Sequence, residues 1–420
     1  MVHLVLIFLL IIIFFARKLF SRTYLTPTGV LCGIWILIIS LKVILAPDFY
    51  FGYEAVFYIG SFSMFFFIGE LLFYFLSKEN DTEEIKEIKP FYEHGEEFKN
   101  RLRKYIIWIS FISLFGSLFY LKAFINHFGS FAEFLIAGEL IRADLFDGNI
   151  SIPAISIFSM LLSYSAINLS MVFYSRYGFY WFQTIPFFSV LILSFSQAAR
   201  AGMVIVIFQI VSGKIFRLLS KNEGKIELKL VKPLLYILPT LLIIFTLIES
   251  FRYQAFEYNS ERVEFTKNTF NVYTFGGVSG FSTYLDEVHK STNDLTYGRY
   301  TFSSLYNLLG IAKAETGIYD QYLNVSPTQT ANIYSIFRPL LEDFGYLGML
   351  IWALILGMIA NFSFRYSLRG SLIGISMCVS IYIYLMFSFI APLTQFNSFL
   401  LSCFLAPLII QISKIRLKLF

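Results

Sequence analysis

Long apolar runs, separated by short polar segments, cover most of the chain. A helix needs about 20 apolar residues to cross a bilayer, within a range of roughly 17–25. By this criterion we predict eleven transmembrane helices, at residues 2–16, 29–46, 55–76, 105–121, 151–174, 179–197, 200–216, 233–250, 345–364, 371–390 and 396–412. The pattern predicts an all-α, polytopic membrane protein whose residues 1–420 form a single integral membrane domain.

The composition agrees with this pattern. Hydrophobic residues make up 57% of the chain and charged residues 15%, and the mean hydropathy is +0.68. A soluble protein of 420 residues cannot bury that much apolar surface. The first apolar run is followed, not preceded, by Arg17 and Lys18, and no small-residue cleavage site appears. We therefore interpret it as a transmembrane helix rather than a signal peptide.

The basic residues predict the orientation. Cytoplasmic connections are enriched in Lys and Arg. One alternate set of connections contains 22 of the 33 basic residues: Arg17, Lys18 and Arg22; seven within 77–104; Arg176; six within 213–232; Arg365 and Arg369; and Lys414, Arg416 and Lys418. We expect this set to be cytoplasmic, with the N-terminus outside and the C-terminus inside. The net charge of +5 does not indicate nucleic-acid binding.

Three connections are long. The segment 77–104 mixes both charge signs and is expected to be a solvated cytoplasmic loop. On the outer side lie a loop at 122–150 and a large segment at 251–344, both expected to be periplasmic. Connections of that length usually contain structure or function of their own, so we expect short helices in the larger one.

Metal and redox chemistry have little support in the sequence. The three cysteines, Cys32, Cys378 and Cys403, fall inside apolar runs and show no disulfide or metal spacing. No HExxH, paired CxxC or nucleotide-binding glycine loop is present. Asp144 and Asp147 leave a weak possibility for a metal. We expect no metal and no cofactor, with arginines providing the positive charge.

Arginines remain on the outer side, where few are expected. They are Arg142, Arg200, Arg252, Arg262, Arg299 and Arg338. Ionisable groups at membrane depth are costly and are often functional. A guanidinium group binds phosphate through a planar pair of N–H donors. Several arginines near the ends of membrane helices could therefore bind the diphosphate of a lipid whose tail stays in the bilayer. For each single arginine, snorkelling or a salt bridge is the alternative.

The stretch NIYSIFRPLLEDFGYLG, residues 332–348, concentrates these features. Pro339 suits the first position of a helix, which places Glu342 and Asp343 in its first turns. In one interpretation the two carboxylates interact favourably with the helix dipole, and Glu342 pairs with Arg338. In the other, one carboxylate, preferably that of Asp343, acts as a general base. Gly345 and Gly348 are expected to allow close approach of a backbone or substrate.

Three further stretches of the sequence contain informative small or aromatic residues. The small residues Ala353 and Gly357 indicate helix packing. The run TFGGVSGFSTYLDEV, 274–288, predicts a glycine-rich turn that enters an amphipathic surface helix, with His289 nearby on the surface. The run YGRYTFSSLYNLLG, 297–310, places Arg299 among aromatic residues that suit sugars and anions.

These motifs together resemble the bacterial oligosaccharide repeat-unit polymerases, the O-antigen and capsule polymerases of the Wzy family. The resemblance rests on N-x-Y-S-x-x-R-x-x-x-x-D-F-G-x-x-G at 332–348, on the preceding runs at 274–285 and 297–310, and on S-x-x-x-R-x-G with Ser196, Arg200 and Gly202. It covers most of the chain. It implies a membrane glycosyltransferase fold of the GT-C-like kind, related to O-antigen ligases.

The resemblance also implies an activity. Such enzymes lie in the bacterial inner membrane and join polyprenyl-diphosphate-linked oligosaccharides, donor to acceptor, at the periplasmic face. A chain-length regulator and a flippase are expected partners besides membrane lipids. We expect catalytic roles for Arg200, Arg338 and Asp343, and substrate contacts from Arg142, Arg252, Arg299, Asn332, Tyr334, Glu342, Gly345 and Tyr346.

Other activities remain open. An O-antigen ligase uses the same donor, and there an outer histidine, His127 or His289, is the expected essential residue. A lipid-linked oligosaccharide flippase is a non-enzyme alternative, although internal repeats and a charged mid-depth cavity are not evident in the sequence. A teichoic acid or peptidoglycan polymerase is a further alternative.

Overall fold

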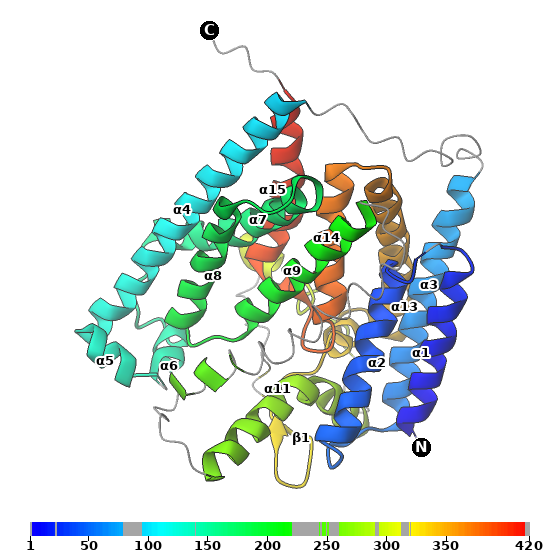
Figure 1. The fold of residues 1–420 in the computed structure, drawn as a ribbon. Coiled ribbons are helices and arrows are strands. Elements are labelled where there is room, and N and C mark those ends of the chain that lie inside the picture. The colour runs from blue at the N-terminus through cyan, green and yellow to red at the C-terminus, as the bar shows by residue number, and fades with distance from the viewer. Residues whose placement is uncertain are drawn as a thin grey trace. The chain divides into compact units, whose positions relative to one another are not determined.

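The chain folds almost entirely into helices (Figure 1). The computed structural model describes residues 2–21, 23–78, 95–138, 140–220, 243, 246–248, 250–251, 260–289, 294–311, 319 and 321–415. The α-helices there are α1 (Val2–Lys18), α2 (Pro27–Leu45), α3 (Tyr53–Lys78), α4 (Glu96–Phe128), α5 (Phe131–Ile136), α6 (Leu140–Phe146), α7 (Ala154–Tyr177), α8 (Ile185–Ser196), α9 (Ala201–Ser220), α11 (Ser260–Glu287), α12 (Ser303–Leu308), α13 (Phe337–Leu368), α14 (Leu372–Phe387) and α15 (Asn397–Lys414). Two 3-10 helices, η1 (Trp181–Thr184) and η3 (Leu393–Gln395), and one antiparallel strand pair, β1 (Leu323–Asn324) with β2 (Thr330–Ala331), complete the described structure.

The chain divides into two compact units. Unit 1 contains residues 1–88, 268–366 and 381–397, and unit 2 contains residues 89–267, 367–380 and 398–420. Each unit is assembled from parts of the chain that are distant in sequence. The predicted single domain is thus built from two units.

Seven of the described helices are long and apolar enough to cross a membrane: α2, α3, α4, α7, α9, α13 and α15. Two shorter apolar helices, at 181–196 and 372–387, coincide with predicted spans, and α1 coincides with the first. The predicted span 233–250 lies mostly outside the described residues. The prediction of an all-α membrane protein is confirmed, and the count of eleven spans stays a prediction.

Helices α3 and α13 of unit 1 approach each other through glycine. A Cβ placed on Gly357 of α13 would lie 2.1 Å from the carbonyl oxygen of Phe66, and one on Gly69 of α3 would lie 2.1 Å from that of Leu354. Only glycine allows two helix backbones to come so close. The prediction that Ala353 and Gly357 serve helix packing is confirmed, since Ala353 is also buried.

A buried charge network joins four helices of unit 1. Glu70 of α3 is fully buried and forms an ion pair with Arg17 of α1. Its other carboxylate oxygen accepts from the Thr28 amide at 2.6 Å, where the first turn of α2 exposes unpaired N–H groups. Asn361 of α13 accepts from Arg17 at 3.3 Å and donates to the Glu70 backbone oxygen at 2.7 Å. The network fixes α1, α2, α3 and α13 in register.

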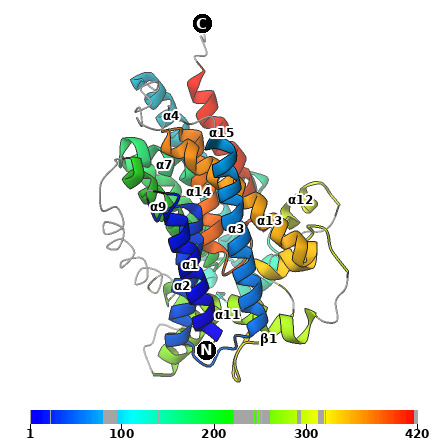
Figure 2. The same ribbon diagram turned by 90° about the vertical axis from the view of Figure 1, so that its right-hand side faces the viewer.

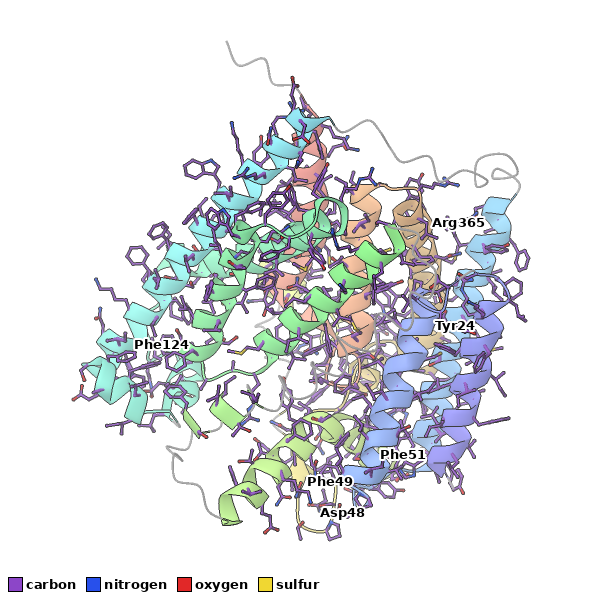
Figure 3. The ribbon with its side chains drawn as sticks, in the orientation of Figure 1. Tyr24, Asp48, Phe49, Phe51, Phe124 and Arg365 are labelled. Atoms are coloured by element: carbon purple, nitrogen blue, oxygen red, sulfur yellow. The ribbon has the colours of Figure 1, made fainter. Side chains whose placement is uncertain are left out.

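The two ends of unit 1 differ in chemistry. Figure 3 labels Asp48, Phe49 and Phe51 at one end and Arg365 at the other. At the first end, Lys42 Nζ donates to the Phe49 carbonyl oxygen at 2.5 Å. At the second, Arg365 donates to Ser77 near the end of α3. Of the predicted cytoplasmic basic residues, Arg365 lies at the second end, near the end of α3.

Small polar side chains pack the helices of unit 2. Ser113 Oγ of α4 lies 2.7 Å from Ser163 Oγ of α7 and 2.6 Å from Ser189 Oγ of α8. Asn168 of α7 donates to Ser380 Oγ of α14 at 3.0 Å. Such hydrogen bonds satisfy polar groups that face neighbouring helices rather than lipid.

The glycine-rich run at 274–288 does not form the predicted turn. Helix α11 continues through it from Ser260 to Glu287. Its glycines instead make a face without side chains: a Cβ on Gly277 would lie 2.3 Å from the Phe389 carbonyl oxygen, and one on Gly280 would lie 2.7 Å from that of Ile333. The prediction was wrong because close packing, not a turn, explains the glycines.

Candidate functional site

The first turns of α13 form a short helix of their own. Residues Phe337–Phe344 are helical, but Gly345 then adopts φ 65° and ψ −177° before the helix resumes. This backbone conformation is essentially restricted to glycine. Gly345 thus divides α13 into a short helix, which carries Arg338 and Asp343, and a longer apolar helix.

The short helix lies inside unit 1, against α2 and α3. The Phe337 ring packs against Trp35 of α2 at 5.4 Å and Phe62 of α3 at 5.3 Å, measured between ring centroids. Phe62 is nine residues into α3, which is roughly 13 Å along a helix. The Ile336 amide also donates to the Ser388 carbonyl oxygen at 2.9 Å, beyond the end of α14. Arg338 therefore starts its helix well inside the bundle.

Three tyrosines enclose the Arg338 guanidinium. Its Cζ lies 4.3 Å from the ring centroid of Tyr284, 3.8 Å from that of Tyr319 and 4.2 Å from that of Tyr334. A cation is attracted to the faces of aromatic rings, and the attraction grows when water is excluded. Only 5% of Arg338 is exposed. We call Arg338 and these tyrosines the arginine cage.

Two of the three guanidinium nitrogens have partners. Nε donates to Glu342 Oε1 at 2.9 Å, one turn along the helix, and Nη2 donates to Gln321 Oε1 at 2.9 Å. Nη1 is buried and has no hydrogen-bond partner within the described part of the chain. An unpaired nitrogen on a buried cation is costly. It is a donor that suits an anion.

The carboxylate of Glu342 contacts two members of the arginine cage, Arg338 and Tyr319. Its second oxygen accepts from the Tyr319 hydroxyl at 2.8 Å. Burial and the negative charge of Glu342 raise the pKa of Tyr319 well above its ordinary value, and burial raises the pKa of Tyr334. Both tyrosines are therefore neutral at working pH. They contribute ring faces and hydroxyl groups rather than charge.

Asp343 points to a different partner, the loop at 294–301. Its Oδ1 accepts from the Thr296 hydroxyl at 2.5 Å and the Tyr300 amide at 3.1 Å, and its Oδ2 accepts from the Thr301 amide at 2.6 Å. The side chain is fully buried. These contacts are those of a positioning residue, because both oxygens are engaged in holding the loop. The prediction that Asp343 is a general base stays a prediction.

Tyr334 reaches the cage from an extended segment that lies on α11. Ala331 lies 3.1 Å from the position a Cβ would take on Gly276, and Tyr334 Cδ1 lies 3.2 Å from that on Gly280. The hydroxyl of Tyr334 donates to the backbone oxygen of Gln321. Because the glycines of α11 carry no side chains, the extended segment packs close to α11, and this packing positions the Tyr334 ring in the cage.

The other predicted site residues of unit 1 lie outside the arginine cage. Asn332 lies half-buried on the segment before Tyr334, and Arg299 is exposed on the loop that Asp343 holds. Tyr346 lies beyond the kink, where its hydroxyl donates to Ser61 Oγ at 3.2 Å and its ring stacks on Phe57. Of the predicted set, Arg338, Tyr334 and Glu342 come together, and the Gly345 kink bounds them.

Three predicted arginines belong to unit 2. Arg200 is half-buried just before α9, and Arg142 lies on α6. Arg252 lies outside the described residues, as does the side chain of Arg142. Their contribution to the site stays a prediction.

Unit 2 contains a histidine–carboxylate pair. His127 Nε2, at the end of α4, lies 2.9 Å from Asp144 Oδ2 on α6. Asn149 Nδ2 donates to the other oxygen at 3.2 Å. The hydrogen bond from His127, and then that from Asn149, lower the pKa of Asp144. The pair is partly exposed. Across the described residues, no group of three or more His, Cys, Asp or Glu is placed to hold a metal ion.

Several site residues were not predicted from the sequence. Tyr284 and Tyr319 belong to the cage, Gln321 accepts from Arg338, and Thr296 belongs to the loop held by Asp343. They lie 17 to 54 residues before the residue they contact, and no local spacing signals such contacts.

Comparison of the chain with protein-family models, with curated proteins and with solved structures found no match. The class that the fold supports is therefore a polytopic helical membrane protein with a buried cationic site.

Proposed function

We propose that the protein is a membrane glycosyltransferase that polymerises polyprenyl-diphosphate-linked oligosaccharide repeat units. The arginine cage is the observation that carries this proposal. It holds a permanent cation at membrane depth, with Nη1 left as a donor within the described part of the chain. A lipid diphosphate has the matching chemistry, since its anionic head lies beside an apolar tail.

The bacterial inner membrane is the proposed location, with the site facing the periplasm. Lys18, Lys78 and Arg365 lie at or near the C-terminal ends of α1, α3 and α13 in unit 1, and the positive-inside rule assigns that end to the cytoplasm. Phe337, which precedes the arginine, contacts α3 in its opposite half. The site would then open to the outer face.

The chemistry follows from the leaving group. When the glycosidic bond to the donor diphosphate breaks, negative charge develops on the lipid diphosphate. Arg338 stabilises that charge in a site from which water is largely excluded. The family resemblance adds Arg200, Arg299, Arg252 and Arg142 as further contacts. The arginines would supply the positive charge without a metal ion.

The acceptor hydroxyl must lose a proton in the same reaction. A carboxylate near the cage would take it, either Asp343 as preferred from the sequence or Glu342. Asn332, Tyr334 and Tyr346 would contact sugar hydroxyls. Donor and acceptor are both lipid-linked oligosaccharides in this proposal, with a chain-length regulator and a flippase as possible partners and a GT-C-like fold for the whole membrane domain.

A deletion strain tests this function. Its surface polysaccharide would be compared on a gel with that of a strain complemented by the wild-type gene. A polymerase predicts that the ladder vanishes and that lipid A core, or its capsule equivalent, bears a single repeat unit. An unchanged ladder in the deletion strain contradicts the proposal.

An O-antigen ligase is a second candidate, favoured by the His127–Asp144 pair. A histidine oriented by a carboxylate suits a general base on the outer side. In that case the deletion strain would accumulate long polymer on the lipid carrier, with bare core. His127→Ala would reproduce that pattern, whereas a polymerase would retain its ladder.

A further inference from the structure

Residues 295–311 run along α13 from the Gly345 kink to Trp352. At one end, Leu295 Cδ2 lies 3.5 Å from the position a Cβ would take on Gly345, at the kink. At the other, the ring of Phe302 meets that of Trp352 at 5.4 Å. Trp352 is seven residues beyond the kink, which is about 10 Å along the helix. Figure 2 shows α12 beside α13 and level with the middle of α3.

The segment exposes an apolar surface at that depth. Leu308 is 76% exposed, Leu309 is 69% exposed and Ile311 is 66% exposed. The neighbouring face of α13 is apolar and exposed as well, through Leu347, Ile351, Ile355 and Ile359. These four residues are spaced four apart and therefore lie on one face of the helix. A spanning helix turns such an apolar face toward lipid. Phe302, just before α12, contacts Trp352, which follows Ile351 in α13.

The backbone of the segment is arranged as lipid contact requires. A non-helical backbone at membrane depth must satisfy its own polar groups. The amides of Thr296 and Tyr297 donate to the backbone oxygens of Glu342 and Asp343, both at 3.0 Å. The amides of Tyr300 and Thr301 donate to the Asp343 carboxylate. Those of residues 299, 302, 305, 306 and 309–311 donate to carbonyls within the segment.

The inner side of the segment is fixed to protein. The Thr301 backbone oxygen accepts from Thr394 Oγ1 at 2.6 Å, and Ser304 donates to the Gln395 backbone oxygen. Thr301, Ser303 and Ser304 are buried. The segment therefore has a polar, anchored side toward η3 and an apolar, exposed side away from it.

We propose that residues 295–311 form a re-entrant lip whose apolar side is embedded among the lipid chains of the bilayer. The occupant of this surface is membrane lipid, because the surface is apolar and exposed and its segment packs through Phe302 on α13, which exposes an apolar stripe of its own. The loop would otherwise belong to the aqueous segment predicted at 251–344. Asp343 accepts hydrogen bonds from this lip and lies on the same short helix as Arg338.

Site-directed fluorescence tests the lip without measuring any activity. Cys32, Cys378 and Cys403 would be replaced by alanine in the full-length protein, and a single cysteine introduced by Leu308→Cys would be labelled with an environment-sensitive fluorophore. The protein would be reconstituted into phosphatidylcholine vesicles. Quenching by spin-labelled lipids would be compared with quenching by aqueous iodide. Leu347→Cys serves as the lipid-facing control, and Thr328→Cys, on the exposed hairpin turn, serves as the aqueous control.

The lip predicts strong quenching of the Leu308 label by spin-labelled lipid and little by iodide, as at Leu347. Quenching by iodide to the extent seen at Thr328 overturns the proposal, because water then covers the surface. Protection from both quenchers overturns it too, because protein then covers the surface. Leu309→Cys repeats the measurement if the first variant does not fold. The outcome is independent of the proposed transferase activity.

Discussion

Arg338 and Glu342 lie one helical turn apart, and Nε of the arginine donates to the carboxylate at 2.9 Å inside a ring of tyrosines. A buried ion pair of this kind is costly to assemble and more costly to break, because the remaining charge is left unpaired. Its position just before a glycine kink places it at the start of a span. The pair stabilises a cation whose third nitrogen, Nη1, is buried without a hydrogen-bond partner within the described part of the chain.

Arg338→Lys should abolish most polymer formation while the protein accumulates normally. Lysine keeps the charge but loses the planar fork, so it cannot donate to Glu342 and Gln321 together and also offer a donor to phosphate. Losing one charge-assisted hydrogen bond in the transition state costs about 1.5–3 kcal/mol, which is a rate loss of roughly tenfold to over a hundredfold. Polysaccharide ladders and membrane protein levels measure both effects.

Arg103→Lys is the matched control for that substitution. Arg103 is exposed at the start of α4 and stacks over Phe182 at 5.5 Å. The same chemical change there should leave the ladder intact. Equal ladders from Arg338→Lys and Arg103→Lys would remove the arginine cage from the mechanism.

Asp343→Asn should loosen the loop at 294–301. The amide cannot accept from Thr296, Tyr300 and Thr301 as the carboxylate does, and a buried donor left unpaired costs about 1–3 kcal/mol. We expect faster trypsin cleavage after Arg299, which is exposed on that loop, in the detergent-solubilised protein. Mass spectrometry of the fragments identifies the site of cleavage.

The same variant separates two roles for Asp343. A positioning residue predicts faster cleavage together with lost polymer. Lost polymer with an unchanged cleavage rate would instead support the general base predicted from the sequence. Glu342→Gln provides the comparison, since Glu342 contacts Arg338 and Tyr319 rather than the loop.

Gly277→Ala should destabilise unit 1 although alanine favours helices. The new methyl group would lie 2.3 Å from the Phe389 carbonyl oxygen. Overpacking of that kind typically costs about 1–3 kcal/mol, more than the roughly 1 kcal/mol gained in helix propensity. Gly33→Ala in α2 has no atom within 4 Å of the new methyl group and should be neutral or stabilising. Thermal unfolding in detergent compares the two, and equal melting temperatures would contradict the close packing.

The His127–Asp144 pair predicts a pH dependence. Because the folded protein lowers the pKa of Asp144 below its ordinary 3.8, the ionised side chain contributes stability above that value. The contribution is lost as the pH falls through the lower folded pKa. The difference in melting temperature between the wild type and Asp144→Asn should therefore persist at neutral and mildly acidic pH and shrink below about 3.8. A difference that already vanishes at mildly acidic pH would contradict the lowered pKa.

Apolar run length predicted the helices well, because a bilayer leaves a spanning chain few alternatives to helix. The glycines of α11 show where that reasoning ends. Gly276, Gly277 and Gly280 have the same sequence pattern whether they form a turn or a flat helix face. The segments that pack on them, residues 331–335 and Phe389, decide between the two, and both lie more than 50 residues away.

The site was predicted in part. The Arg338–Glu342 pair follows from i,i+4 spacing on a helix, which is local information. The tyrosines and Gln321 that enclose Arg338 reach it through tertiary packing, as does the loop that occupies both oxygens of Asp343. Buried charges such as Glu70 were also missed, because an acidic residue within an apolar run gives no indication of its partner.

The most direct test is polymerisation by the purified protein in vesicles supplied with a polyprenyl-diphosphate-linked oligosaccharide from its native pathway. Product length would be followed on a gel for the wild type, Arg338→Lys and Arg103→Lys. The proposal predicts a ladder of multiples of the repeat unit with the wild type and Arg103→Lys, and a ladder that forms roughly tenfold to over a hundredfold more slowly with Arg338→Lys. A ladder of equal length from Arg338→Lys, or intact single units from a folded wild type, would contradict it.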